Sequence, residues 1–280
     1  MLVDSHCHLD FPDLIQDETA MLARMADNGV THALCVAVKL ETLAGVIGAA
    51  ERHPNVFASV GVHPDNADCE EPDEARLLEL AAHPKVVAIG ETGLDYYWHK
   101  DAPEWQRARF RTHIRAARRC AKPLIIHTRD SAADTLRLMQ EEGAGEAGGV
   151  MHCFTETLEV AKGALDLGFY ISFSGIVSFK NAESLRDVAR YVPADRLLVE
   201  TDAPPLGVFD HVHRLGEWIR DEDAVLVGQE HRRAEAGEAQ PAAALLPEVT
   251  SANTSRFCTP AETSASSCNW ASWFDVLTRV

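Results

Sequence analysis

The sequence predicts a single (β/α)₈ barrel (TIM barrel), and three observations lead to that prediction. The chain has 280 residues, 46% of them hydrophobic, a size that α/β barrels commonly reach as one domain. Eight short apolar runs alternate with stretches of helical periodicity, which is typical of a parallel sheet. Residues able to bind metals follow these runs, and the chemistry of a closed barrel lies at the carboxyl ends of its strands.

The first half of the chain contains four of the predicted units. The apolar start, Met1–Val3, begins a strand, and a helix at 18–28 ends at Gly29. A continuous apolar run at 31–38 predicts a strand buried on both faces. The elements that follow are helix 40–52, strand 56–62, helix 73–82, strand 86–90 and the amphipathic helix 104–120.

The second half repeats the pattern with shorter elements. Strand 123–126 is followed by Asp130 and Ser131. We expect these residues to cap the next helix, which runs to about residue 142, because short polar side chains accept hydrogen bonds from the first backbone N–H groups. The remaining elements are strand 149–151, helix 158–167, strand 169–173, helix 181–191 and strand 197–199.

Two histidines, His6 and His8, lie at the end of the first strand. Alternate residues of a strand point to the same side, and two neutral imidazoles can begin a divalent metal site. Alone, this pattern also fits two polar residues at a strand end. Further candidates at strand ends favour the metal site: His63, Glu91, His127, His152 and Asp202. We assign His32, His53, His83 and His113 to surface or helix positions without function.

The predicted metal ligands are His6, His8, Glu91, His127, His152 and Asp202. They suffice for two divalent ions, with Glu91 as the bridge, because a carboxylate can span ions about 3.5–4 Å apart. Nitrogen and carboxylate ligands admit Zn²⁺, Mn²⁺, Co²⁺ or Ni²⁺, and Mg²⁺ with water ligands. The alternative is that each side chain only hydrogen-bonds nearby loops.

Six motifs, in order, resemble those of the TatD family of metal-dependent deoxyribonucleases, and most closely its bacterial YcfH type. The resemblance covers residues 1–204 and implies a TIM-barrel hydrolase that cleaves DNA phosphodiesters, with the six residues above as metal ligands. The motifs are Asp4-Ser5-His6-Cys7-His8, Gly61-Val62-His63-Pro64, Gly90-Glu91-Thr92-Gly93-Leu94-Asp95-Tyr96-Tyr97, Ile126-His127-Thr128-Arg129-Asp130, His152-Cys153-Phe154 and Glu200-Thr201-Asp202-Ala203-Pro204.

Glu91 and Asp202 are the predicted catalytic residues. Two ions lower the pKa of a bound water and supply hydroxide near neutral pH. Asp202 would hold one ion and orient or deprotonate that water, or it would be a ligand only. Glu200 lies two residues earlier and would share the face of Asp202, so it could contact a ligand.

Three further residues are predicted to bind substrate. His63 could donate to a phosphate or assist the leaving oxygen, although its place before Pro64 favours a turn histidine. Arg129 could clamp a phosphate with its planar fork, or form an ion pair with Asp130 or Asp95. Tyr96 could stack on a base, or anchor its loop.

Net charge and cysteine content indicate which partners and which cellular compartment to expect. A net charge of −17 opposes a basic surface that coats nucleic acid, whereas bound ions would dominate the field of a metal site. We expect DNA as substrate, single-stranded or at its ends, and no obligate protein partner. Seven scattered cysteines indicate reduced thiols in a cytoplasmic protein. We expect neither a membrane span nor a signal peptide.

The family pattern stops after Pro204. We therefore predict a barrel domain at 1–225 and a divergent, partly disordered segment at 226–280. Two other functions stay open: an amidohydrolase or lactonase acting on a small substrate, and an inactive relic impaired by its altered C-terminus. Small-substrate hydrolases of this type often bridge ions with a carboxylated lysine, and Lys122 precedes strand 123–126, at the wrong end.

Overall fold

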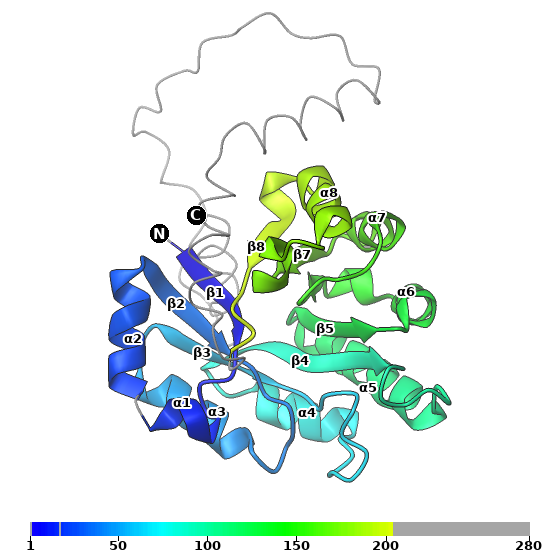
Figure 1. The fold of residues 1–280 in the computed structure, drawn as a ribbon. Coiled ribbons are helices and arrows are strands. Elements are labelled where there is room, and N and C mark those ends of the chain that lie inside the picture. Colours follow the sequence, from blue (N-terminus) through cyan, green and yellow to red (C-terminus); the bar gives the residue numbers. More distant parts are fainter. Residues whose placement is uncertain (1, 17, 204–280) are drawn as a thin grey trace, which may run out of the picture.

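Eight parallel strands, hydrogen-bonded in chain order from β1 to β8, form the centre of the protein, and helices surround them (Figure 1). The computed structural model describes residues 2–16 and 18–203. The strands are β1 Leu2–Cys7, β2 Val30–Cys35, β3 Val56–Val60, β4 Val86–Asp95, β5 Leu124–Arg129, β6 Gly149–Met151, β7 Tyr170–Phe173 and β8 Leu197–Val199. The predicted (β/α)₈ barrel is confirmed.

The helices connect consecutive strands, as parallel pairing requires. The α-helices are α1 Pro12–Ile15, α2 Glu18–Asp27, α3 Leu43–Arg52, α4 Glu74–Ala81, α5 Glu104–Cys120, α6 Ala132–Glu141, α7 Leu158–Asp166 and α8 Glu183–Tyr191. Short 3₁₀ turns are η1 Ala144–Glu146, η2 Gly175–Ser178 and η3 Ala194–Arg196.

The seam between the first and last strands closes at its carboxyl end. Cys7 and Ala203 form a parallel bridge. The N–H of His8 donates to the carbonyl of Ala203 (2.9 Å), and the N–H of Asp202 donates to the carbonyl of His6 (2.9 Å). Barrel closure therefore brings two predicted ligands, His6 in β1 and His8 directly after it, next to Asp202, which follows β8.

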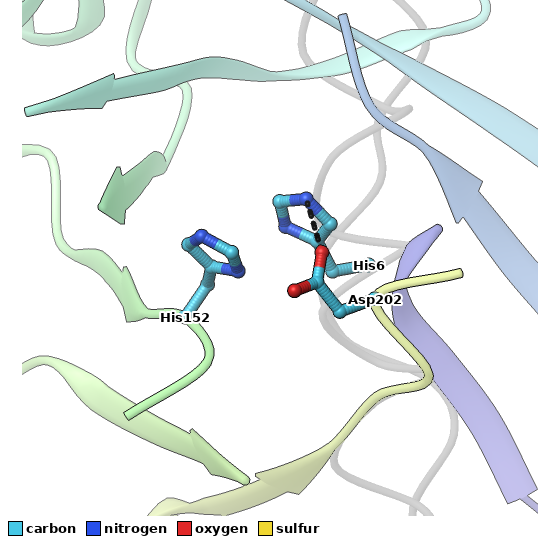
Figure 2. A group of neighbouring side chains, drawn as sticks. All are labelled: His6, His152 and Asp202. Atoms are coloured by element: carbon cyan, nitrogen blue, oxygen red, sulfur yellow. Dashed lines mark ion pairs between the residues drawn. The ribbon is translucent and has the colours of Figure 1, made fainter. Parts of the chain in front are cut away.

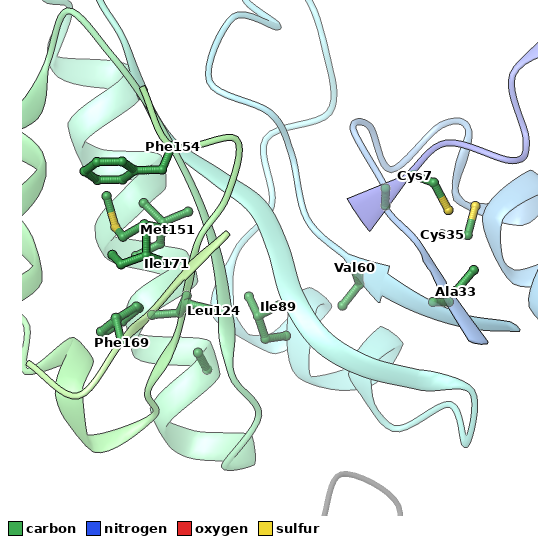
Figure 3. Close-up of a cluster of buried hydrophobic side chains, with 14 of the residues drawn as sticks. Cys7, Ala33, Cys35, Val60, Ile89, Leu124, Met151, Phe154, Phe169 and Ile171 are labelled. Atoms are coloured by element: carbon green, nitrogen blue, oxygen red, sulfur yellow. The ribbon is translucent and has the colours of Figure 1, made fainter. Parts of the chain in front are cut away.

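The main core lies between the strands and the helices. Figure 3 shows part of it, with Ile89 and Leu124 on neighbouring strands and Phe169 beside β7. All three are fully buried, and burying a side chain of this kind stabilises the fold by about 1.5–3 kcal/mol. This packing makes the strands a rigid support for the residues at their ends.

Several predicted boundaries were wrong. The strand predicted at 86–90 continues to Asp95, because Gly93 to Asp95 still pair with β5. The strand predicted at 31–38 ends at Cys35, and α1 was not predicted. Ser131 occupies the N-cap position of α6 but makes no capping hydrogen bond, since its hydroxyl donates to the carbonyl of Leu94 (2.9 Å). The barrel residues predicted at 204–225 and the segment 226–280 lie outside the described residues.

Two general expectations can be compared with the part of the chain that the structure describes. Within it, no helix has both the length and the apolar character needed to cross a membrane. The five cysteines in these ranges are all unpaired.

Candidate metal centre

The strand alternation expected for His6 and His8 brings their imidazoles together. The two Nε2 atoms are 3.3 Å apart, and both rings are buried. Nδ1 of His8 bonds to the carbonyl of Val36 (2.9 Å). Because a carbonyl can only accept, this contact makes Nδ1 the protonated nitrogen and leaves Nε2 with a free lone pair.

Glu91 lies at the centre of the cluster, and only 3% of its surface is exposed. Its Oε2 is 3.4 Å from Nε2 of His6. Its Oε1 is 2.7 Å from Nε2 of His152, 3.2 Å from Nδ1 of His127 and 3.3 Å from Nε2 of His63. The two oxygens therefore face different imidazoles.

Close backbone packing sets the position of Glu91. A Cβ atom on Gly61 would lie 2.5 Å from the carbonyl carbon of Gly90, so β3 and β4 approach here at a distance that only glycine permits. The N–H of Glu91 donates to the carbonyl of Ala37 (3.0 Å). The β4–β5 register shifts between Ile89 and Thr92, and such irregularities re-aim side chains near active sites.

Asp202 completes the cluster from the other side of the seam. Its Oδ1 lies 3.8 Å from Nε2 of both His6 and His8. Figure 2 shows His6, His152 and Asp202 converging from three different segments of the barrel. The rings of His6 and His152 stack at a centroid distance of 3.9 Å.

A second layer of carboxylates orients the imidazoles. Nδ1 of His152 lies 3.3 Å from Oε1 of Glu200, the kind of supporting contact expected for that residue. Nε2 of His127 lies 3.2 Å from Oδ2 of Asp95. The sequence analysis gave Asp95 no such role, although its place in the Glu91 motif, near the end of β4, was an available signal.

Asp4 is another buried carboxylate near the cluster, and its role was not predicted from the sequence. Its side chain accepts hydrogen bonds from the N–H of Thr201 (3.0 Å) and the hydroxyl of Thr201 (2.7 Å). Both residues are buried. Asp4 thus ties the start of β1 to the segment that carries Asp202.

Electrostatics keep the two inner carboxylates ionised. Burial raises the pKa of Glu91, but the surrounding imidazoles outweigh it and hold that pKa well below its usual range. Burial likewise raises the pKa of Asp202, while the nearby imidazoles of His8, His152 and His6 lower it to about 2. Two neighbouring carboxylates that stay charged attract cations.

The donor atoms fit divalent metal ions. Three groups of potential ligand atoms each lie within 4.8 Å of one another: His6, His8 and Glu91; His6, His152 and Asp202; His63, Glu91 and His127. Two nitrogens on one tetrahedral zinc ion are about 3.3 Å apart, given Zn–N bonds of about 2.0–2.1 Å. The two Nε2 atoms of His6 and His8 have this separation.

One unsatisfied nitrogen supports the same fit. Nε2 of His152 is 2.7 Å from a Glu91 oxygen, yet it has no hydrogen-bond partner of acceptable geometry among the described residues. A buried polar atom without a partner is costly. A cation shared by the imidazole and the carboxylate would remove that cost.

The cluster opens into a cavity of about 560 Å³. His63 and Arg129 line it. The guanidinium of Arg129 lies over the ring of Tyr97, 3.9 Å from the centroid, instead of forming either ion pair considered above.

Tyr96 is not among the residues that line the cavity, and the base-stacking role stays a prediction. Its hydroxyl donates to Asp134 (2.7 Å) on α6, and this bond holds the side chain as an anchor of its loop. The neighbouring Tyr97 and Trp98 expose 42% and 64% of their surfaces.

The histidines assigned no function lie outside the cluster. His113 is on α5, as expected of a helix position, but it is fully buried. Lys122 lies away from the cavity, and its Nζ donates to the carbonyls of Ala81 and Val86. Within the described ranges, no lysine lines the cavity.

Comparisons with known proteins agree with this geometry. The family described as TatD related DNase matches residues 3–233. The uncharacterized metal-dependent hydrolase YcfH of Escherichia coli is 50% identical over 213 residues, which are 75% of this chain and 80% of that protein. The 3'-5' ssDNA/RNA exonuclease TatD of Enterobacter lignolyticus is 33% identical over 207 residues, 73% of this chain and 80% of that protein. Among solved structures, the TatD homolog YJJV of Escherichia coli has a TM-score of 0.71 and 28% identity, and covers 83% of this chain and 96% of its own.

Proposed function

This chain belongs to the TatD family of metal-dependent hydrolases, and from this premise we propose that it cleaves phosphodiester bonds of DNA at a dinuclear metal site. The proposed substrate is single-stranded DNA or an unpaired end. The observation that carries the proposal is Glu91, a buried carboxylate whose two oxygens face different imidazoles at the barrel mouth.

The proposed metal ligands are His6, His8, Glu91, His127, His152 and Asp202. The division of imidazoles between the oxygens of Glu91 supports a bridging role for this residue. Bound divalent ions would supply Lewis acidity and lower the pKa of a coordinated water.

Asp202 is proposed to orient the attacking water. Its side chain is 31% exposed, against 4% for Glu91, so it is the carboxylate that water in the cavity can reach. Its pKa of about 2 keeps it ionised at neutral pH. It can therefore accept a hydrogen bond from the water, although it is too weak a base to hold the proton for long.

Arg129 and His63 are proposed to bind the phosphate. Both line the cavity, and the planar guanidinium can donate two parallel hydrogen bonds to phosphate oxygens. Nε2 of His63 is 3.3 Å from Nδ1 of His127, so a phosphate bound by His63 would lie next to the proposed metal ligands. These two cationic or donor groups offset the acidic character of the chain locally.

An unpaired strand suits the burial of the site. Glu91 is 3% exposed, so a phosphodiester must enter the cavity to reach it. A flexible single strand can bend its backbone inward and stack its bases on rim aromatics. The Enterobacter relative that is named an ssDNA/RNA exonuclease supports this choice.

The test is hydrolysis of labelled single-stranded DNA by the purified full chain with Mn²⁺, Mg²⁺ or Zn²⁺. Glu91→Ala and Asp202→Ala remove the proposed chemistry, and Glu141→Ala, an exposed carboxylate on α6, is the matched control. Activity in the parent and in the control, and none in the two site variants, supports the nuclease.

The other outcomes lead to the two alternatives. No DNA cleavage with metal still bound favours a hydrolase of small amide or lactone substrates. Against it, no lysine among the described residues lines the cavity to serve as a carboxylated bridge. If the protein shows no cleavage and also binds no metal, the result would indicate that the C-terminal part has disabled the site.

A further inference from the structure

Helix α5 carries three buried polar side chains on one face. Gln106 and His113 are fully buried, and Arg109 is 3% exposed. Their spacing of three and four residues places them on successive turns of the helix. Buried polar groups need hydrogen-bond partners. The partners of all three side chains include backbone atoms of segments that lead into the metal centre.

Three consecutive residues that follow β3 each bind a different side chain of this face. Because residue 63 is one of them, the face controls the backbone from which the His63 imidazole projects. The bonds are Val62 N–H to Nε2 of His113 (3.1 Å), Nη1 of Arg109 to the His63 carbonyl (3.0 Å) and Nε2 of Gln106 to the Pro64 carbonyl (2.9 Å).

Gln106 also binds the end of β4. Its Oε1 accepts from the N–H of Asp95 (3.1 Å), and its Nε2 donates to the carbonyl of Asp95 (3.1 Å). The carboxylate of Asp95 in turn contacts Nε2 of His127 (3.2 Å). One side chain therefore links the turn that carries His63 with the residue that orients His127.

The direction of each bond at His113 is determined by its two partners. Nδ1 lies 2.9 Å from the carbonyl of Arg109, which can only accept, so Nδ1 carries the proton. Nε2 then accepts the N–H of Val62. A neutral imidazole in a single tautomer holds this backbone in one position.

We propose that the buried face of α5, formed by Gln106, Arg109 and His113, positions the His63 imidazole and the Asp95 carboxylate against His127. The three residues act through these groups and touch no substrate. The kinetic part of the test rests on the proposed function, whereas the spectroscopic part does not.

The kinetic test compares His113→Leu in the parent and in a His63→Ala background. With Mn²⁺ and bis(p-nitrophenyl) phosphate, kcat/KM should fall about 10- to 100-fold in the parent, the usual cost of losing a supporting contact. In the His63→Ala background the same substitution should change kcat/KM less than about twofold, because the effects of linked residues are not additive. His113→Gln, whose carbonyl can accept from Val62, should restore most of the activity.

The spectroscopic test records imidazole ¹H–¹⁵N correlations of the metal-free protein, with the His63 and His127 signals assigned from alanine variants. Those signals should move in His113→Leu and stay in Phe110→Leu, a fully buried control on the same helix. Gln106→Met replaces His113→Leu if the latter does not fold. Equal kinetic losses in both backgrounds, or unmoved signals, would overturn the proposal, and the signals alone decide it if no hydrolysis is detected.

Discussion

Acidification should weaken the fold through His113. Burial, together with Arg109, lowers the pKa of His113 from 6.5 to about 4, against the opposing effects of its bond to the Arg109 carbonyl and of the Glu71 carboxylate. Above pH 6.5 the imidazole is neutral whether the chain is folded or unfolded. Between pH 6.5 and 4 only the unfolded chain binds the proton, so stability falls as the pH falls, and the loss is complete below the folded pKa.

The size of the effect follows from that interval. One pH unit corresponds to about 1.4 kcal/mol, so the range from 6.5 to about 4 is worth about 3 kcal/mol of unfolding free energy. His113→Gln keeps an acceptor for Val62 and removes the titrating group. The stability advantage of the parent over this variant should therefore shrink by about 3 kcal/mol on going from pH 7 to below pH 4.

The assay is urea denaturation in EDTA across this range, so that metal release does not contribute. Other titrating groups are common to both proteins and cancel in the difference. A difference in unfolding free energy that stays constant from pH 7 to pH 4 would refute the assignment of His113 as a buried neutral imidazole.

Three other predictions concern the metal centre. Saturating Mn²⁺, at about 100 times Kd, should stabilise the parent by about 2.7 kcal/mol and raise its Tm by about 5–10 °C. Thermal scans of Glu91→Gln should show almost no rise in Tm on adding Mn²⁺. An equal rise in Tm in parent and variant would contradict the bridging role. Glu200→Gln, which weakens the support of His152, should lower metal affinity about 10- to 100-fold in titration calorimetry, and unchanged affinity would count against that support. Arg129→Ala should raise KM about tenfold for both single-stranded DNA and bis(p-nitrophenyl) phosphate, because each presents a phosphodiester to the guanidinium; an unchanged KM on both substrates would argue against phosphate binding by this residue.

The order of strands and helices could be predicted because it is encoded locally. Helix 104–120 and strands 149–151 and 197–199 were predicted with the bounds that the structure has. The end of β4 was not, since the strand was predicted to end at Gly90 and continues to Asp95. A Cβ on Gly90 would lie 2.8 Å from the Cβ of Ile125, so this glycine permits close strand packing instead of a turn.

The candidate site divides in the same way. The imidazoles and inner carboxylates could be named in advance because each follows an apolar run, and the barrel topology brings the ends of those runs together. The residues that support these ligands could not be predicted from the sequence. Gln106 lies in the first turn of a long helix, and nothing in its neighbourhood along the chain indicates that it binds Pro64 and Asp95. The partner of Tyr96 could not be predicted for the same reason, since Asp134 is 38 residues away.

The sequence by itself determined the alternation of strands and helices, and with it the end of the barrel at which metal-binding side chains gather. Periodicity and residue type are local properties, and they are sufficient for that conclusion. Only the tertiary structure decided which nitrogen faces which oxygen and which carboxylate supports which imidazole. Asp4 and Thr201 are separated by 197 residues, and they meet because the barrel closes, which depends on the packing of all eight strands at once.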